Sequence, residues 1–290
     1  MMMTRRATQS CRLIDSHGVD QLNIVPTLAF ATPVFVIYVA AVIFVEMHVM
    51  VTNTTHLTIF SVGFYVIFST YYVADYHMKT MSRSYDAIPE DKRFYVLSNL
   101  IKSAVLCAYC PSCVNLLYRG LVLDEWVTTR IRTMGVLYAI PDAVSLLVVS
   151  RMATSTRVHH ICVVIFMFVN LQITYEEKNV GRALMVYGIF STFAYLVNLL
   201  LASRFLPIGS SLARSLSVLA FIVYFCCLLV NWTWQVHYLI DIWHGLGNAR
   251  RIMIVAYVTI MTMVVRDDCV LIRWLYKNMR KHTRMAEKTK

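Results

Sequence analysis

The chain has 290 residues, of which 58% are hydrophobic and only 15% are charged, and its formal net charge is +11. This composition excludes an ordinary soluble domain. The positive charge does not indicate nucleic-acid binding, because much of it lies beside apolar runs, where basic loops of membrane proteins occur, and no nucleic-acid-binding motif is present. We therefore predict an all-α, multi-pass membrane protein.

Apolar runs recur along the chain, and a helix needs roughly 20 such residues to cross the hydrocarbon core of a bilayer. Strands of a β-barrel would alternate apolar and polar residues, whereas runs such as FVIYVAAVIFV do not. The sixth and seventh runs are separated only by the short turn around Pro207. The pattern predicts about eight membrane-spanning helices, at 25–47, 56–74, 95–118, 133–150, 157–174, 182–205, 211–232 and 250–276.

The loop charges predict the orientation, because Lys and Arg concentrate on the cytosolic side of a membrane protein. Most loop cations fall on the side that also holds the basic segment WLYKNMRKHTRMAEKTK. An even number of helices then puts both termini in the cytosol and the sequon at Asn53 in the lumen. We expect four parts: a cytosolic N-terminal tail (1–24), two leading helices with a cytosolic loop (25–94), a helical domain (95–276) and a basic cytosolic tail (277–290).

The third predicted helix contains the motif CAYCPSC, with Cys107, Cys110 and Cys113 three residues apart. Three thiols fall short of the four that a zinc or iron–sulfur site would require. We expect these cysteines to pack as small polarisable side chains, with a redox or acylation site as the alternative. No metal site is predicted.

Polar side chains inside predicted spans are costly in lipid and indicate function. With a helical rise of about 1.5 Å per residue, Asp142 lies roughly 12 Å, Asn198 roughly 9 Å, and the pair Asp267 and Asp268 roughly 13 Å from the cytosolic end of its helix. This shared depth predicts a cavity that opens toward the cytosol. A helix that ended at Val265 would instead leave the two C-terminal aspartates in the cytosol.

Two adjacent histidines open the fifth predicted helix, in the segment RVHHICVVIFMFVN. Consecutive helical residues point about 100° apart, so we expect only one ring to face the cavity squarely. We predict that this ring is His160, because His159 lies nearer the solvated Arg157. Asp142 and Asn198 come out roughly 5–8 Å deeper than the rings by the same helical rise. The alternative is a pair of interfacial histidines that only anchors the helix end.

Three segments together resemble a known family. The segments GVLYAIPDAVSLL, RVHHICVVI and FSTFAYLVN occur in this order and resemble the TLC domain, which is shared by ceramide synthases and several other membrane proteins. The resemblance covers roughly 95–276. It implies a six-helix barrel that encloses a lipid-sized cavity. The residues that match are Asp142, His159, His160, Ser191, Thr192 and Asn198.

One departure separates this sequence from the ceramide synthases, which carry acidic residues on the helix after the histidine pair. Here that helix reads GRALMVYGIFSTFAYLVNLL and contains no acid. The sequence is therefore more similar to the branch without synthase activity, whose members are linked to membrane lipid composition. This implies a protein of lipid metabolism in the endoplasmic reticulum or another internal membrane, which binds or regulates lipids in its cavity.

The alternative function is a ceramide-synthase-like acyltransferase that moves an acyl group from acyl-CoA to a sphingoid base or another lipid acceptor. Its candidate catalytic residues are His159, His160 and Asp142, because an imidazole acts as a nucleophile or a general base. In both cases the partner is membrane lipid, joined by acyl-CoA in the second, and no cofactor is expected. The sequence leaves open whether the chain forms a homodimer. The candidate lipid-binding residues are Ser191, Thr192, Asn198, Asp267 and Asp268.

Overall fold

The computed structural model describes residues 54–245 and 248–287, and all the regular secondary structure within them is helical. The predicted N-terminal tail (1–24), the first predicted helix (25–47) and the sequon at Asn53 lie outside the described residues. The prediction of an all-α protein is confirmed. The helices are α2 (Thr54–Met81), α3 (Arg83–Asp86), α4 (Glu90–Leu121), α5 (Thr128–Val148), α6 (Thr154–Asn170), α7 (Val180–Thr192), α8 (Tyr195–Ser203), α9 (Ser210–Gly245) and α10 (Asn248–Glu287).

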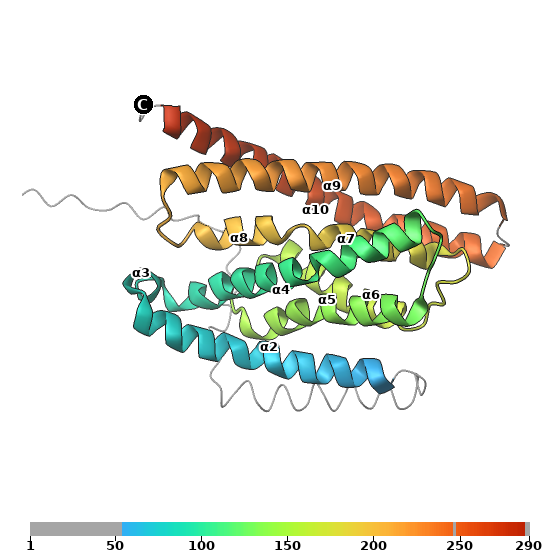
Figure 1. Ribbon diagram of the computed structural model, residues 1–290, viewed down its shortest axis with the longest axis horizontal. Helices are drawn as coiled ribbons and strands as arrows, with labels where there is room; N and C mark the ends of the chain where they lie inside the picture. The colour runs from blue at the N-terminus through green and yellow to red at the C-terminus, as the bar shows by residue number, and fades with distance from the viewer. Residues whose placement is uncertain (1–53, 246–247, 288–290) are drawn as a thin grey trace, which may run out of the picture.

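The long helices lie side by side along the long axis of the molecule (Figure 1). Helix α2 packs against α4 and α5, and α9 packs against α10, α8 and α7. In Figure 1, α2 forms one edge of the bundle, the α9–α10 pair forms the opposite edge, and the remaining helices lie between them. In this view α4 to α8 therefore lie between the two edges of the described bundle.

Helix α2 shows how these residues build a bundle surrounded by lipid. Its buried aromatic side chains, Phe60, Phe64 and Phe68, recur every four residues and pack in one core with side chains of α5. The opposite face is also apolar, since Val62 and Tyr65 are more than half exposed. A helix that is hydrophobic on both faces suits a position between a protein core and lipid.

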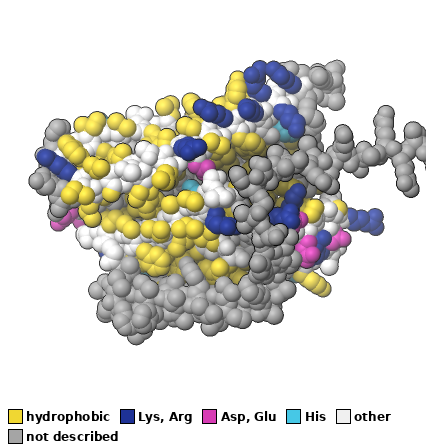
Figure 2. Space-filling model, turned by 180° about the vertical axis from the view of Figure 1, so that it is seen from behind, with side chains coloured by type: hydrophobic (Ala, Val, Ile, Leu, Met, Phe, Trp, Pro, Cys, Tyr) yellow, Lys and Arg dark blue, Asp and Glu magenta, His cyan; other side chains and the backbone are white. Residues whose placement is uncertain are grey.

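The face of the molecule shown in Figure 2 is also largely apolar. Hydrophobic side chains cover most of its described surface, and Lys and Arg side chains gather mainly toward the end at which α3 and the C-terminus lie. This is the end that the loop charges assign to the cytosol.

Four helices in the described part of the chain, α2, α4, α5 and α9, are long and apolar enough to cross a membrane. The pair α7 and α8 adds a fifth if the two are counted as one span, bent by 42°. These helices are compatible with an integral membrane protein, but the predicted eight spans are not confirmed. Helix α6 has 17 residues, which is short of the roughly 20 that a perpendicular span needs.

The single helix predicted at 182–205 is broken into α7 and α8. The hydroxyl of Ser191 donates to the backbone oxygen of Tyr187 at 2.9 Å, and that of Thr192 donates to the oxygen of Gly188 at 3.3 Å. Such bonds to the preceding turn compete with the helical ladder and bend helices. The Ser-Thr pair of the FSTFAYLVN segment therefore lies at the bend.

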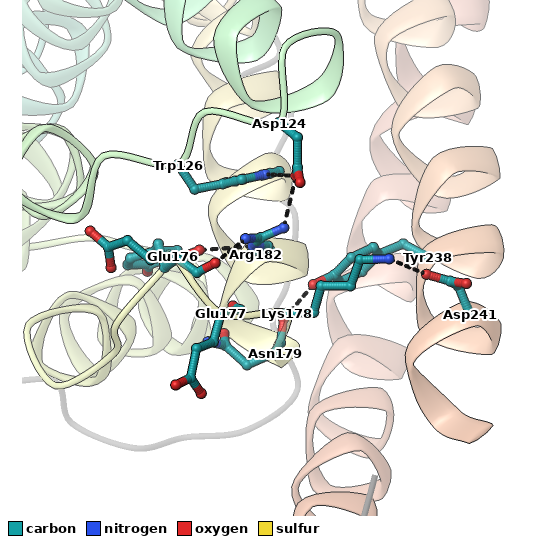
Figure 3. A network of polar contacts seen from close by, with 10 residues as sticks. Asp124, Trp126, Glu176, Glu177, Lys178, Asn179, Arg182, Tyr238 and Asp241 are labelled. Carbon is teal, nitrogen blue, oxygen red and sulfur yellow. Dashed lines mark hydrogen bonds and ion pairs between the residues drawn. The ribbon is translucent and has the colours of Figure 1, made fainter. Parts of the chain in front are cut away.

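The loops opposite the basic end are joined by Arg182, in the first turn of α7, which is only 3% exposed (Figure 3). Its guanidinium donates to the backbone oxygens of Tyr175 at 2.8 Å and Glu176 at 2.7 Å, and to the carboxylate of Asp124 at 3.0 Å. The guanidinium also stacks on the ring of Trp126, 4.6 Å from its centroid. One side chain thus links the α4–α5 loop to the α6–α7 loop.

A second link in Figure 3 attaches α9 to this end of the molecule. The hydroxyl of Tyr238 donates to the backbone oxygen of Asn179 at 2.9 Å, and Lys178 pairs with Asp241 at 2.9 Å.

In the same loop, Glu176 accepts hydrogen bonds from the side chain and the backbone N–H of Thr128, and these bonds lower the pKa of its carboxyl group.

We expect Arg182→Lys to lower the free energy of unfolding in detergent micelles by about 2–3 kcal/mol, because an ammonium group cannot bond three acceptors and stack on an indole at once. Chemical unfolding followed by circular dichroism measures this. Lys178→Ala is the matched control: its ion pair with Asp241 is 60% and 51% exposed, so the loss of stability should be much smaller than that of Arg182→Lys. Equal losses in the two variants would contradict the role assigned to Arg182.

Candidate functional site

A cavity of about 390 Å³ lies between α4, α5, α6, α7, α8, α9 and α10, at the basic end of the bundle. Its wall combines hydroxyl, amide, imidazole and carboxylate groups with apolar side chains. Six of the residues predicted from sequence line it: His159, His160, Ser191, Asn198, Asp267 and Asp268. The structure therefore brings together residues that are up to 109 positions apart in the chain, as the span from His159 to Asp268 shows.

At the cavity wall, two titratable side chains from α4 and α6 contact a buried carboxylate of α5. The Nδ1 atom of His160 lies 2.7 Å from Oδ1 of Asp142, and Lys102 of α4 donates to the same oxygen. Asp142 is fully buried and His160 is 7% exposed. The carboxylate therefore lies behind the imidazole, away from the cavity, and contacts one ring nitrogen.

The contact between His160 and Asp142 corrects the depth estimated from sequence, which separated them by roughly 5–8 Å. Helix α6 begins at Thr154 and α5 ends at Val148, whereas the sequence suggested 157 and 150. With these bounds, each side chain lies six residues from its helix end, or roughly 9 Å at the standard rise. The errors in the predicted start of α6 and the predicted end of α5 together account for the separation that the sequence suggested.

Both histidine rings line the cavity, and the expectation that only one of them faces it squarely stays a prediction. The two ring centroids are 5.8 Å apart and the ring planes meet at 76°. The difference between them lies in their contacts: His160 is buried against Asp142, whereas His159 is partly exposed. His160 is thus the fixed ring of the pair.

The aspartates of α10 form the opposite wall. Helix α10 continues without a break to Glu287, so the alternative that it ends at Val265 is wrong, and the first part of the predicted basic tail is helical. Asp268 is buried and accepts a hydrogen bond of 2.8 Å from the hydroxyl of Tyr224 on α9. Asp267 lines the same cavity.

Two predicted residues do not line this cavity. Asp142 lies behind His160, and Thr192 faces the interior between α4 and α7, where it accepts a contact of 3.5 Å from the thiol of Cys113. The motif CAYCPSC is spread around α4: Cys107 is exposed and Cys113 is buried. Among the residues that the structure describes, no group of three His, Cys, Asp or Glu side chains is placed to hold a metal ion.

The sequence reasoning missed Lys102, the ion-pair partner of Asp142. The signal was present, because a lysine within the apolar run NLIKSAVL costs free energy in lipid unless an acid neutralises it. It also missed the tyrosines Tyr138, Tyr187 and Tyr224, which add hydroxyl groups to the cavity wall. Tyrosines are common in membrane helices, so no sequence signal distinguished these three.

Fold and site together define a helical bundle with membrane-length helices and a polar cavity at its basic end. Comparison with protein-family models, with curated proteins and with solved structures finds no match to this chain.

Proposed function

We propose that this protein binds membrane lipids in the cavity at its basic end and takes part in lipid metabolism, as its resemblance to the TLC domain implies. The observation that carries the proposal is the composition of the cavity wall. Polar groups that contact a lipid head lie beside apolar side chains that accept a chain, among them Leu106, Val197, Leu201, Val270 and Leu271.

An exposed cation on the cavity wall supports a ligand with a polar or anionic head. Arg204 lines the cavity, is exposed, and stacks on Trp274 with its guanidinium carbon 5.6 Å from the ring centroid. In the orientation that the loop charges favour, the basic end of the bundle faces the cytosol. A lipid enters there with its head near Arg204 and its chain directed inward, in an internal membrane such as the endoplasmic reticulum.

The second candidate function is acyl transfer, and one observation favours it: the contact between His160 and Asp142. Because Nδ1 is held by the carboxylate, Nε2 is left as the nucleophile, and the negative charge stabilises the imidazolium that develops. Nε2 attacks the carbonyl carbon of an acyl thioester, the C–S bond breaks and the thiolate leaves. An acceptor amine or hydroxyl then attacks the acyl-imidazole, the C–N bond breaks, and the proton of the acceptor passes to the thiolate.

Binding of a radiolabelled fatty acid to the purified protein in detergent micelles tests the first function. We expect palmitate to bind saturably and to be displaced by unlabelled palmitate. Asn198→Leu, on the cavity wall, should weaken binding about tenfold, while Leu199→Ala, on the exposed face of the same helix, should not. Saturable binding that is equal in the two variants would place the lipid outside the cavity.

A further inference from the structure

A small hollow of about 20 Å³ lies against the inner wall of the cavity and shares four of its residues: Tyr187, Ser191, Tyr224 and Asp268. Its remaining lining includes Asn231 of α9. By the same measure of volume, one water molecule or one hydroxyl group needs roughly 10–15 Å³. The hollow therefore has room for a single oxygen atom with its hydrogens.

Two buried polar atoms on this hollow have no hydrogen-bond partner among the described residues: Oδ2 of Asp268 and Nδ2 of Asn231. The other oxygen of Asp268 is bonded by Tyr224 at 2.8 Å. Tyr187 and Trp232 also present donors to this carboxylate, but neither makes a hydrogen bond to Oδ2. Asp268 is 6% exposed and Asn231 is 0% exposed, so neither residue is open to bulk water.

The orientation of the Asn231 amide is fixed by its neighbours. Its Oδ1 accepts from Gln235 at 3.2 Å, and Gln235 in turn accepts from the hydroxyl of Tyr257 at 2.6 Å. The nitrogen of Asn231 is therefore the donor that remains. In the interior of a membrane bundle, such a donor costs several kcal/mol when it has no partner.

A free acceptor and a free donor on one hollow select the chemistry of the group that fits. An ammonium group has no acceptor for the amide, and a carboxylate has no donor for Asp268. A hydroxyl group has both, because its O–H donates and its lone pairs accept. The hollow matches a hydroxyl group.

Its distance from the mouth of the cavity fits a long chain. Asp268 is six residues from Trp274 along α10, or roughly 9 Å, and Asn231 is seven residues beyond Tyr224 along α9, or roughly 10 Å more. The two helices run antiparallel, since Tyr224 contacts Asp268 and Gln235 contacts Tyr257. Both residues line the hollow, which therefore lies roughly 9–19 Å inward from the Arg204–Trp274 contact by the same rise.

We infer that Asp268 and Asn231 form an inner subsite that binds a hydroxyl group near the far end of a bound lipid chain, while the head of the lipid lies near Arg204. This inference rests on the proposed function, because it names the class of lipid that the cavity takes. A water molecule that permanently fills the hollow is the competing occupant.

The test compares palmitate with ω-hydroxypalmitate, which differs only by a hydroxyl at the far end, in equilibrium binding to the purified full chain in detergent micelles. We expect the wild type to bind ω-hydroxypalmitate about tenfold more tightly. Asn231→Leu should abolish this preference. Asn198→Leu, nearer the mouth, should weaken both ligands and keep their ratio. Cys227→Leu narrows the same hollow while both polar side chains are kept, and should abolish the preference even if Asn231→Leu does not fold.

The outcomes separate this subsite from the proposed function. Binding of palmitate without any preference for the hydroxyl would mean that water alone occupies the hollow, and would overturn the subsite but not lipid binding. A preference that survives in both Asn231→Leu and Cys227→Leu would place the hydroxyl elsewhere and overturn it too. A wild type that binds neither ligand would overturn both proposals.

Discussion

Replacing His160 with alanine should abolish the effect of this protein on the lipid composition of its membrane. His160 is the histidine whose Nδ1 is held by Asp142, so its loss removes the positioned ring and leaves the carboxylate facing the cavity. If the protein transfers acyl groups, the rate should fall at least about 100-fold, the usual contribution of a positioned acid–base group. Lipid profiles of membranes that contain wild type, variant or no protein measure the effect, with expression levels matched.

His159→Ala is the matched control, because it removes the neighbouring ring, whose centroid is 5.8 Å away, and leaves the ion pair of His160 with Asp142 in place. We expect it to reduce the effect only partly, or to lower the amount of folded protein. Asp142→Asn keeps the shape of the side chain but removes its charge, and should give an intermediate result. If both single histidine variants left the lipid profile unchanged, the pair would be only an anchor for the helix end.

Lys102→Met should destabilise the fold by about 3–5 kcal/mol, the usual cost of removing one partner from a buried ion pair. Asp142 is fully buried, and without Lys102 its negative charge would remain in the bundle interior with only a histidine beside it. Unfolding by a denaturing detergent from mixed micelles measures the change in free energy.

A second substitution separates the effect of charge from the effect of packing. The double variant Lys102→Met/Asp142→Asn has no unpaired charge, so it should regain most of the lost stability. Arg151→Met is the surface control: its pair with Asp91 is 56% and 28% exposed, and the loss should stay below about 1 kcal/mol. A double variant no more stable than Lys102→Met alone would show that the lysine acts through packing and not through its charge.

The expected effects of His160→Ala and Lys102→Met both depend on the contacts of Asp142 with these two residues. Lys102 neutralises the carboxylate and makes its burial tolerable, and the carboxylate holds the imidazole. Stability and function are therefore linked through Asp142, whose second oxygen has no hydrogen-bond partner among the described residues. An unsatisfied buried oxygen lowers the stability of the fold, and such groups are common at functional sites.

The sequence alone determined the class of the fold and six of the polar residues on the cavity wall. Long apolar runs permit only helices in lipid, because each backbone N–H and C=O must be bonded within its own segment. Charged and amide side chains within those runs are costly unless they share a polar interior, so His160, Asn198 and Asp268 were predictable as neighbours. The likeness to the TLC domain and the lipid function stay proposals.

Only the tertiary structure decided which side chains touch. The pairing of Asp142 with His160 depends on where α5 and α6 end, and an error of two or three residues moves a side chain by roughly 3–5 Å. The bend between α7 and α8 depends on whether hydroxyls bond to the preceding turn, which the apolar pattern does not record. The hollow between Asp268 and Asn231 depends on the register of two antiparallel helices, and that register is set by side-chain packing along their whole length.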